Sequence, residues 1–269
     1  MATIAPRSAE GAHAGSVARR ISRSLWPALA LAGAPFLGSG CATPGPNHLY
    51  TFNSDEPSTI RDTGPDGSAN VPSFSTTEDG VTGMAYDPYT DHLFLRLAPG
   101  DRIRVVDRPD RSIKREFTIP NLSDTGGGDL AVRPRDGHIF LICPGQKYLV
   151  EADRFGKWRR QFTLEKLKSE PVGLAYDAVR QRLLVATSGP DAELSVHDLA
   201  GRQLHSSALK LSNIASLAYD ATHREIYAII PDELVTRVLN EEGELLRVVS
   251  SPDRVDFIDL GQRSFVRVF

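Results

Sequence analysis

Short apolar stretches separated by polar turns recur along most of this chain. Four segments share one order of polar and apolar positions: GMAYDPYTDHLFLRL from Gly83, DLAVRPRDGHIFLIC from Asp129, GLAYDAVRQRLLVAT from Gly173 and SLAYDATHREIYAII from Ser216. A weaker fifth copy, DFIDLGQRSFVRVF, begins at Asp256. The four strong copies start 46, 44 and 43 residues apart. A repeat of this length built from short strands predicts the blades of a β-propeller.

Each repeat has the pattern of four strands joined by tight turns. A first strand such as LAYD precedes an apolar second strand such as RLLVAT, and a polar loop leads to a third strand such as LSVHD. After another polar turn comes an outer strand such as QLHSSAL. Helical periodicity is nearly absent, and only Leu164–Glu170 suits a single helical turn. The sequence therefore predicts an all-β fold.

Certain residue types recur at fixed places in the first strand, and each has a physical role. A small residue is expected where neighbouring sheets approach closely: Ala85, Ala131, Ala175 and Ala218. Large side chains on the opposite face should fill the gap between blades: Leu174, Tyr176, Leu217 and Tyr219. Asp87, Asp177 and Asp220 end the strand and should bind turn amides. The alternative, a metal ringed by these aspartates, conflicts with Arg133 in the second repeat.

A closed ring must join its two ends, because otherwise an edge strand stays exposed. The C-terminal copy supplies the first two strands of a blade, whereas His48–Asn53, Ser58–Thr63 and the segment VPSFSTT suit its middle and outer strands. This predicts a composite N-/C-terminal blade and five blades in all. Six would follow if the N-terminal strands formed their own blade. The apolar-poor stretch Thr63–Gly80 is expected to be a long surface loop.

The N-terminal segment is unlike the repeats and suits a secretory signal. Three arginines before an apolar run of about a dozen residues fit a signal peptide, and that run is shorter than the roughly 20 residues of a membrane helix. The LGSGC that ends at Cys41 resembles a bacterial lipobox, with Gly38 where leucine is usual. We expect residues 1–41 to be a lipoprotein-type signal peptide, with Cys41 lipidated, 42–47 a tether and 48–269 one propeller domain. The alternatives are ordinary cleavage near Gly40 and a twin-arginine signal.

Composition limits the classes of partner that the chain is expected to bind. The chain of 269 residues is 41% hydrophobic and 24% charged, with a net charge of −3. It has no basic block interleaved with aromatic residues, so nucleic acid is not an expected partner. With Cys41 acylated, Cys143 stands alone in the apolar HIFLIC, which favours a buried, unreactive thiol.

A family resemblance accompanies these patterns. The series GLAYD, RLLVAT and ELSVHDLAGRQL resembles the YVTN- and NHL-type repeats of bacterial extracytoplasmic propellers, and DRIRVVDRPDRSIKREFTI resembles the NHL ending. The resemblance covers about residues 80–269. It implies the fold and leaves the activity open, since such propellers include binding scaffolds, lactonases and lyases.

Ligands of related propellers bind on the face formed by the loops that enter the first strand and the loops between the second and third strands. On this chain those loops are rich in acidic residues. The candidate binding face consists of Asp101, Asp129, Gln146, Lys147, Asp191 and Asp232. Such loops can hold Ca²⁺ or attract a basic partner, and they are also ordinary solvated loops.

Two functional hypotheses follow. The first is a non-enzymatic binding or scaffolding module without a cofactor. It would be held at the bacterial cell envelope by lipid, on the periplasmic side of the outer membrane or on the cell surface, and would bind an envelope protein, peptide or glycan. The second, by resemblance to gluconolactonase-like propellers, is a Ca²⁺-dependent hydrolase that uses Glu170, Asn213 and Asp256 as ligands. The histidines His92, His138 and His223 recur at strand starts or turns, which does not suit a catalytic base.

Overall fold

The computed structural model describes residues 47–55, 58–75, 80–122, 126–231 and 233–262. Within these ranges all regular structure is β-strand, in five four-stranded antiparallel sheets. The contacts within the chain separate residues 1–41 from 42–269, and the five sheets belong to the second unit. No helix in the described ranges is long and apolar enough to span a membrane.

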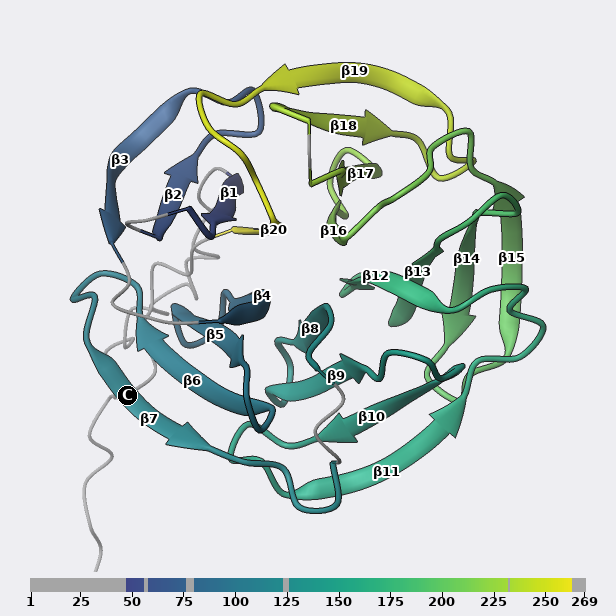
Figure 1. The fold of residues 1–269 in the computed structure, drawn as a ribbon, viewed down its shortest axis with the longest axis horizontal. Helices are drawn as coiled ribbons and strands as arrows, with labels where there is room; N and C mark the ends of the chain where they lie inside the picture. Colours follow the sequence, from purple (N-terminus) through teal and green to yellow (C-terminus); the bar gives the residue numbers. More distant parts are fainter. Residues whose placement is uncertain (1–46, 56–57, 76–79, 123–125, 232, 263–269) are drawn as a thin grey trace, which may run out of the picture. The chain divides into compact units, whose positions relative to one another are not determined.

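The sheets are the five blades of a β-propeller (Figure 1). Blade 1 contains β4 (Val81–Asp87), β5 (His92–Leu97), β6 (Arg102–Asp107) and β7 (Ile113–Phe117). Blade 2 contains β8 (Leu130–Arg133), β9 (His138–Ile142), β10 (Tyr148–Ala152) and β11 (Trp158–Thr163). Blade 3 contains β12 (Pro171–Asp177), β13 (Arg182–Thr187), β14 (Glu193–Asp198) and β15 (Gln203–Ala208). Blade 4 contains β16 (Ser216–Asp220), β17 (Glu225–Ile229), β18 (Val235–Leu239) and β19 (Leu245–Ser250). The first strand of each blade lies nearest the axis, which confirms the predicted fold.

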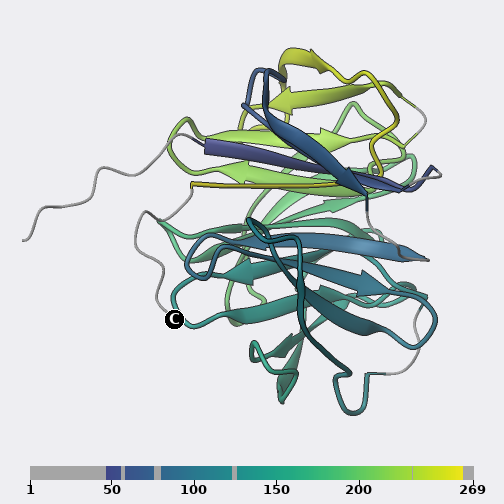
Figure 2. The ribbon, with the colours of Figure 1, turned by 90° about the vertical axis from the view of Figure 1, so that its left-hand side faces the viewer.

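Blade 5 is built from both ends of the described chain, as predicted. Its strands are β20 (Phe257–Gln262), β1 (Asn47–Asn53), β2 (Thr59–Thr63) and β3 (Ala69–Ser75), in that order from the axis outward. Strands β1 and β20 run antiparallel side by side, with pairs from Asn47↔Gln262 to Phe52↔Phe257 (Figure 2).

Two details of blade 5 differ from the prediction. The C-terminal copy supplies one strand of this sheet and not two, because β1 already pairs with the outer edge of β20. Residues 263–269, which were expected to form the second strand, lie outside the described residues. The expected loop Thr63–Gly80 contains β3, which pairs with β2 through Thr59↔Ser75 and Ile60↔Phe74. This confirms the segment VPSFSTT as the outer strand of the blade and corrects the expectation of an uninterrupted loop, which the low apolar content of the stretch had favoured.

The core consists of five apolar clusters, one between each pair of neighbouring blades. Ala85 of blade 1 packs with Leu130 and Val132 of blade 2, and Ala175 packs in the same way with Leu217 and Tyr219. The small residue thus leaves room for the large side chains of the next inner strand, as predicted. Each fully buried Leu or Val contributes about 1.5–3 kcal/mol through removal of apolar surface from water.

The turns after the inner strands are held by the aspartates that the repeat singled out. Asp87 accepts the amide of Tyr89, and Asp177 accepts that of Val179, both at 3.0 Å. Asp220 likewise accepts the amide of Thr222 at 2.8 Å. The predicted role of these residues is therefore confirmed. By contrast, Leu164–Glu170 contains only an isolated turn and no helical turn.

Candidate functional site: an axial pocket

A pocket of about 330 Å³ opens on the axis, at the face where the turns between first and second strands lie. All five inner strands contribute to its wall, which places it at the centre of the ring. One position of each inner strand recurs in the lining: Tyr86, Val132, Tyr176, Tyr219 and Leu260. The turns that follow add Pro88, Pro134, Ala178, Val179, Ala221 and Thr222. This face is opposite the one that carries the candidate loops of the sequence analysis.

The tyrosines of the wall are fixed because their rings are wedged between blades. The Tyr86 ring lies 4.4 Å, centre to centre, from that of Tyr50, and its hydroxyl donates to Asp91 at 2.9 Å. Gly261 permits this packing, since a Cβ at that position would come within 2.6 Å of the Tyr86 ring. The Tyr219 hydroxyl contacts Glu241 at 2.7 Å, and burial together with that carboxylate raises the pKa of Tyr219 to about 12. The pocket wall is therefore rigid and mostly apolar.

Asp259 is the exceptional residue of this pocket. In the four other blades alanine occupies the corresponding inner-strand position, which faces the next blade. The Asp259 carboxylate accepts the amides of Tyr86 at 2.6 Å and Leu260 at 2.7 Å. Burial raises its pKa to about 7 in spite of these hydrogen bonds. The side chain still has accessible surface, and it lines the pocket. A carboxyl group whose pKa is raised by burial in a pocket is a candidate functional group.

Asp129 lies within the ring as well, at the start of β8. Inner strands have a free edge toward the axis, and their amides there need acceptors. Asp129 accepts the amide of Leu174 at 2.8 Å, that of Leu217 at 3.1 Å and the hydroxyl of Ser216 at 3.1 Å. Burial raises its pKa well above the usual range, and the charge of Asp259 adds to this effect. Asp129 therefore joins blades 2, 3 and 4 from within.

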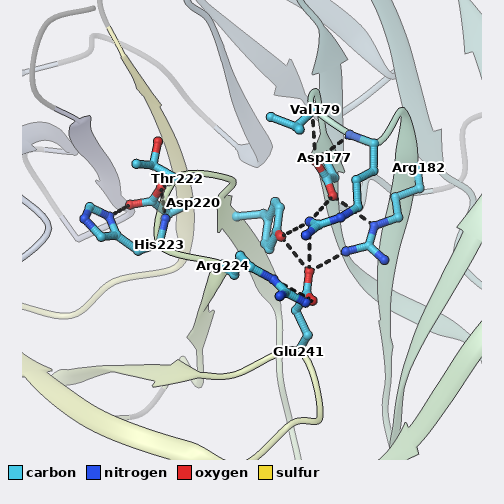
Figure 3. A network of polar contacts seen from close by, with 10 residues as sticks. Asp177, Val179, Arg182, Asp220, Thr222, His223, Arg224 and Glu241 are labelled. Atoms are coloured by element: carbon cyan, nitrogen blue, oxygen red, sulfur yellow. Dashed lines mark hydrogen bonds and ion pairs between the residues drawn. The ribbon is translucent and has the colours of Figure 1, made fainter.

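The rim between blades 3 and 4 is a network of ion pairs (Figure 3). Glu241 accepts hydrogen bonds from Arg182 and Arg224, and Arg182 also donates to Asp177 at 2.9 Å. Burial alone would raise the pKa of Glu241. The hydrogen bonds from Arg224 and Tyr219, with the charge of Arg182, outweigh burial and lower that pKa to about 2. The network fixes the turns that carry the pocket residues Val179 and Thr222.

Two residues of the candidate binding face, Asp101 and Asp129, are buried. Asp101 is only 2% exposed and pairs with the buried Arg96 at 2.8 Å, so like Asp129 it points into the protein and not toward solvent. Gln146 and Asp191 are exposed. Lys147 is exposed too and donates to the carbonyls of Leu167 and Lys168. Asp232 lies outside the described residues.

The three residues of the alternative metal set lie in the loops that precede the inner strands of three blades. Glu170 and Asn213 are exposed before β12 and β16. Asp256 is 7% exposed, and its two carboxylate oxygens accept from the Ser54 amide and from Arg254, each at 2.7 Å. No group of three or more His, Cys, Asp or Glu side chains in the described ranges is arranged to hold a metal ion.

Sequence reasoning missed the axial pocket. Aligned from Asp256, the fifth copy has Ile258 at the alanine position, and the packing of β20 in the ring is what places Asp259 there. An acidic residue at a position that faces a neighbouring blade is costly unless it has a role. The histidines follow the prediction: His92 and His138 begin second strands, and His223 lies in a turn.

Comparison with known proteins supports the fold. Neither a protein-family profile nor a curated protein sequence matches the chain. A chain in the crystal structure of a nidogen/laminin complex is 13% identical, with a TM-score of 0.58, covering 80% of this chain and 98% of that one. The glutaminyl cyclase of Myxococcus xanthus is 16% identical, with a TM-score of 0.51, covering 64% of this chain and 70% of that one. At these identities the likeness shows a shared β-propeller fold alone.

Proposed function

We propose that this protein is a non-enzymatic binding module whose axial pocket takes an ammonium group presented by a peptide or protein partner. The observation that carries the proposal is Asp259, a titratable carboxyl group on the wall of an otherwise mostly apolar pocket. The partner would contribute a lysine side chain or an N-terminal amine.

Charge favours a cationic ligand. Among the described residues that line the pocket, Asp220 and Asp259 are acidic and none is basic. The Asp220 carboxylate already accepts hydrogen bonds from the Asn47 side chain and the Thr222 amide, and it contacts the His223 ring. Each carboxylate oxygen of Asp259 has one backbone donor, and a carboxylate accepts about four hydrogen bonds in total, so capacity for an ammonium group remains.

Size favours a single extended group. A volume of about 330 Å³ is near the lower end of ligand sites, which span roughly 300–1,000 Å³. The wall of ring edges and prolines suits the methylene groups of a lysine side chain, with the charged end at Asp259.

We also propose that the module is held at the bacterial envelope through an acylated Cys41. The support is the signal-like sequence before Cys41 and the polar tether after it. Metabolic labelling with a fatty-acid probe should mark the wild type and leave Cys41→Ser unlabelled. Equal labelling of both proteins would refute the anchor without affecting the pocket.

The pocket is tested by calorimetric and NMR titration of the full chain with the peptide Ac-Gly-Lys-Gly-NH₂ and its neutral counterpart Ac-Gly-Gln-Gly-NH₂. We expect saturable binding of the lysine peptide only, with shifts of the Tyr86 and Leu260 amides. Asp259→Ala, which installs the residue of the other four blades, should weaken binding at least tenfold. The matched control Asp191→Asn removes an exposed carboxylate elsewhere and should bind normally.

The pH dependence gives a second readout. Affinity should rise between pH 6 and pH 8, because ionised Asp259 becomes the major form above its pKa of about 7. Equal affinity for both peptides, or unchanged binding by Asp259→Ala, would overturn the proposal.

A further inference from the structure

A second cavity lies between blades 1 and 2. It measures about 590 Å³ and shares no lining residue with the axial pocket. We call it the interblade cleft. It lies between strands β5–β7 and the turn that joins β10 to β11, and its functional lining consists of Tyr89, His92, Lys114, Arg115, Arg154 and Phe155.

Two exposed aromatic rings flank the cleft, each with an arginine from the neighbouring blade over it. The Arg115 guanidinium of blade 1 lies 4.9 Å from the ring centre of Phe155 in blade 2. Arg154 of blade 2 lies 5.7 Å from the ring centre of Tyr89 in blade 1. Phe155 is 66% exposed and Tyr89 42% exposed. Both rings therefore keep exposed apolar surface that a ligand can contact.

Three carboxylates also line the cleft, but Asp107 and Asp110 lie against Lys114, so Asp87 is the acidic residue that acts on the two arginines. Arg115 donates to the backbone carbonyl of Arg154 at 3.0 Å, so the two side chains belong to one cluster. Burial and the charge of Arg154 lower the pKa of Arg115. Arg154 lies 3.9 Å from Asp87, a carboxylate already used by Tyr89 and Thr90. An anion in the cleft would relieve this repulsion.

Polar groups for a hydroxylated ligand are also present. His92 lines the cleft and its side chain is 18% exposed, so its ring can meet a sugar hydroxyl group. Burial lowers the pKa of His92, so its ring is neutral at pH 7 and can donate or accept. Asp110 also lines the cleft and is largely exposed, which gives hydroxyl groups an acceptor.

From this combination we infer that the interblade cleft binds a uronic acid unit of an acidic polysaccharide. The sugar carboxylate would meet Arg115 and Arg154, its apolar ring face would stack on Phe155 or Tyr89, and its hydroxyl groups would reach His92 and Asp110. A simple anion would use the guanidinium groups alone, and a neutral sugar would leave their charge unmatched. This inference is independent of the amine site at Asp259.

The experiment is a calorimetric titration of the full chain with oligogalacturonate, a neutral galactose oligosaccharide of equal length, and inorganic sulfate. We expect oligogalacturonate to bind at least tenfold more tightly than either comparison ligand. Arg115→Gln and Phe155→Ala should each weaken it at least tenfold. Phe155 is a surface residue in a turn, so its variant keeps the test valid even if Arg115→Gln fails to fold.

A matched control uses the same kind of arginine–aromatic contact outside the cleft. Arg160 lies 4.8 Å from the ring centre of Phe162, and Arg160→Gln should bind oligogalacturonate like wild type. Absence of binding, equal binding of sulfate or of the neutral oligosaccharide, or equal losses in Arg160→Gln and Arg115→Gln would overturn the inference.

Discussion

Replacing Asp259 by asparagine tests whether the axial carboxyl group is held under electrostatic strain. Asparagine has nearly the same size, and its amide oxygen can accept the Tyr86 amide as the carboxylate does at 2.6 Å. The variant therefore removes titration while it retains packing. If Asp259 is strained as its environment indicates, the variant gains stability relative to wild type as pH rises.

The magnitude follows from the pKa of Asp259, which changes from 3.8 in the unfolded chain to about 7 in the folded protein. Between these values the folded state retains a proton that the unfolded state has lost, so stability falls as pH rises through this window. Below pH 3.8 the contribution is fully present, and above pH 7 its loss is complete. About three pKa units correspond to about 4 kcal/mol. Because the side chain keeps some access to solvent, we expect about 2–4 kcal/mol.

The assay is urea-induced unfolding of wild type and Asp259→Asn at intervals from pH 4 to pH 8.5. The difference in unfolding free energy should shift in favour of the variant by the stated amount, with its steepest change between pH 4 and pH 7. Asp129 remains in both proteins, but the charge of Asp259 raises its pKa, so Asp259→Asn also lowers the pKa of Asp129 and this adds to the gain of the variant at high pH. The control Asp191→Asn, on an exposed loop, should differ from wild type by a constant amount. Parallel curves for wild type and Asp259→Asn would refute the reasoning.

Three further predictions concern the framework. Glu241→Gln should lower the free energy of unfolding at pH 7 by about 1–2 kcal/mol, measured with urea. This is less than the pKa shift of Glu241 from 4.5 to about 2 implies, because Arg224 is exposed. The difference from wild type should shrink as pH falls from 4.5 toward 2, and a difference that persists at pH 2 would contradict this. Arg96→Met should lower the free energy of unfolding by about 3–5 kcal/mol in thermal unfolding, since it leaves the carboxylate of Asp101 buried without the guanidinium of Arg96. Adding Asp101→Asn should recover part of this stability, and no recovery would argue against the ion pair. Calorimetric titration with Ca²⁺ should show no stoichiometric binding, because no group of three or more His, Cys, Asp or Glu side chains among the described residues is arranged to hold a metal ion; binding abolished by Asp256→Asn would instead support a Ca²⁺-dependent hydrolase.

The fold was predictable because the same residue types pack at the same positions of the inner strand in each blade. Alanine on one face of an inner strand and a large apolar residue on the other recur at a fixed spacing, and the side-chain alternation of strands fixes their register. Ring closure followed from the absence of a complete blade at either end. The outer strand β3 was less visible, because the sequence around it has few apolar residues.

The site was less predictable because it depends on contacts between distant repeats. Asp129 has the sequence context of a loop residue, yet it binds amides 45 and 88 residues further along the chain. Asp101 is buried beside Arg96, whose guanidinium crosses from blade 1 to the carbonyl of Ile142 in blade 2. The interblade cleft likewise combines residues of two repeats, none of which is unusual within its own repeat. Asp259 takes the place of the recurring alanine only in the register that β20 adopts in the ring.

The pairing of β1 with β20 has a consequence for how the polypeptide matures during synthesis. Strand β1 is synthesised long before β20, so its inner edge has no partner until that strand has left the ribosome. Until then β1 offers unpaired amides and carbonyls that other nascent chains can capture. A holding chaperone that shields this edge would therefore raise the yield of intact rings, and a truncation before Phe257 would leave even a complete set of four blades prone to aggregation.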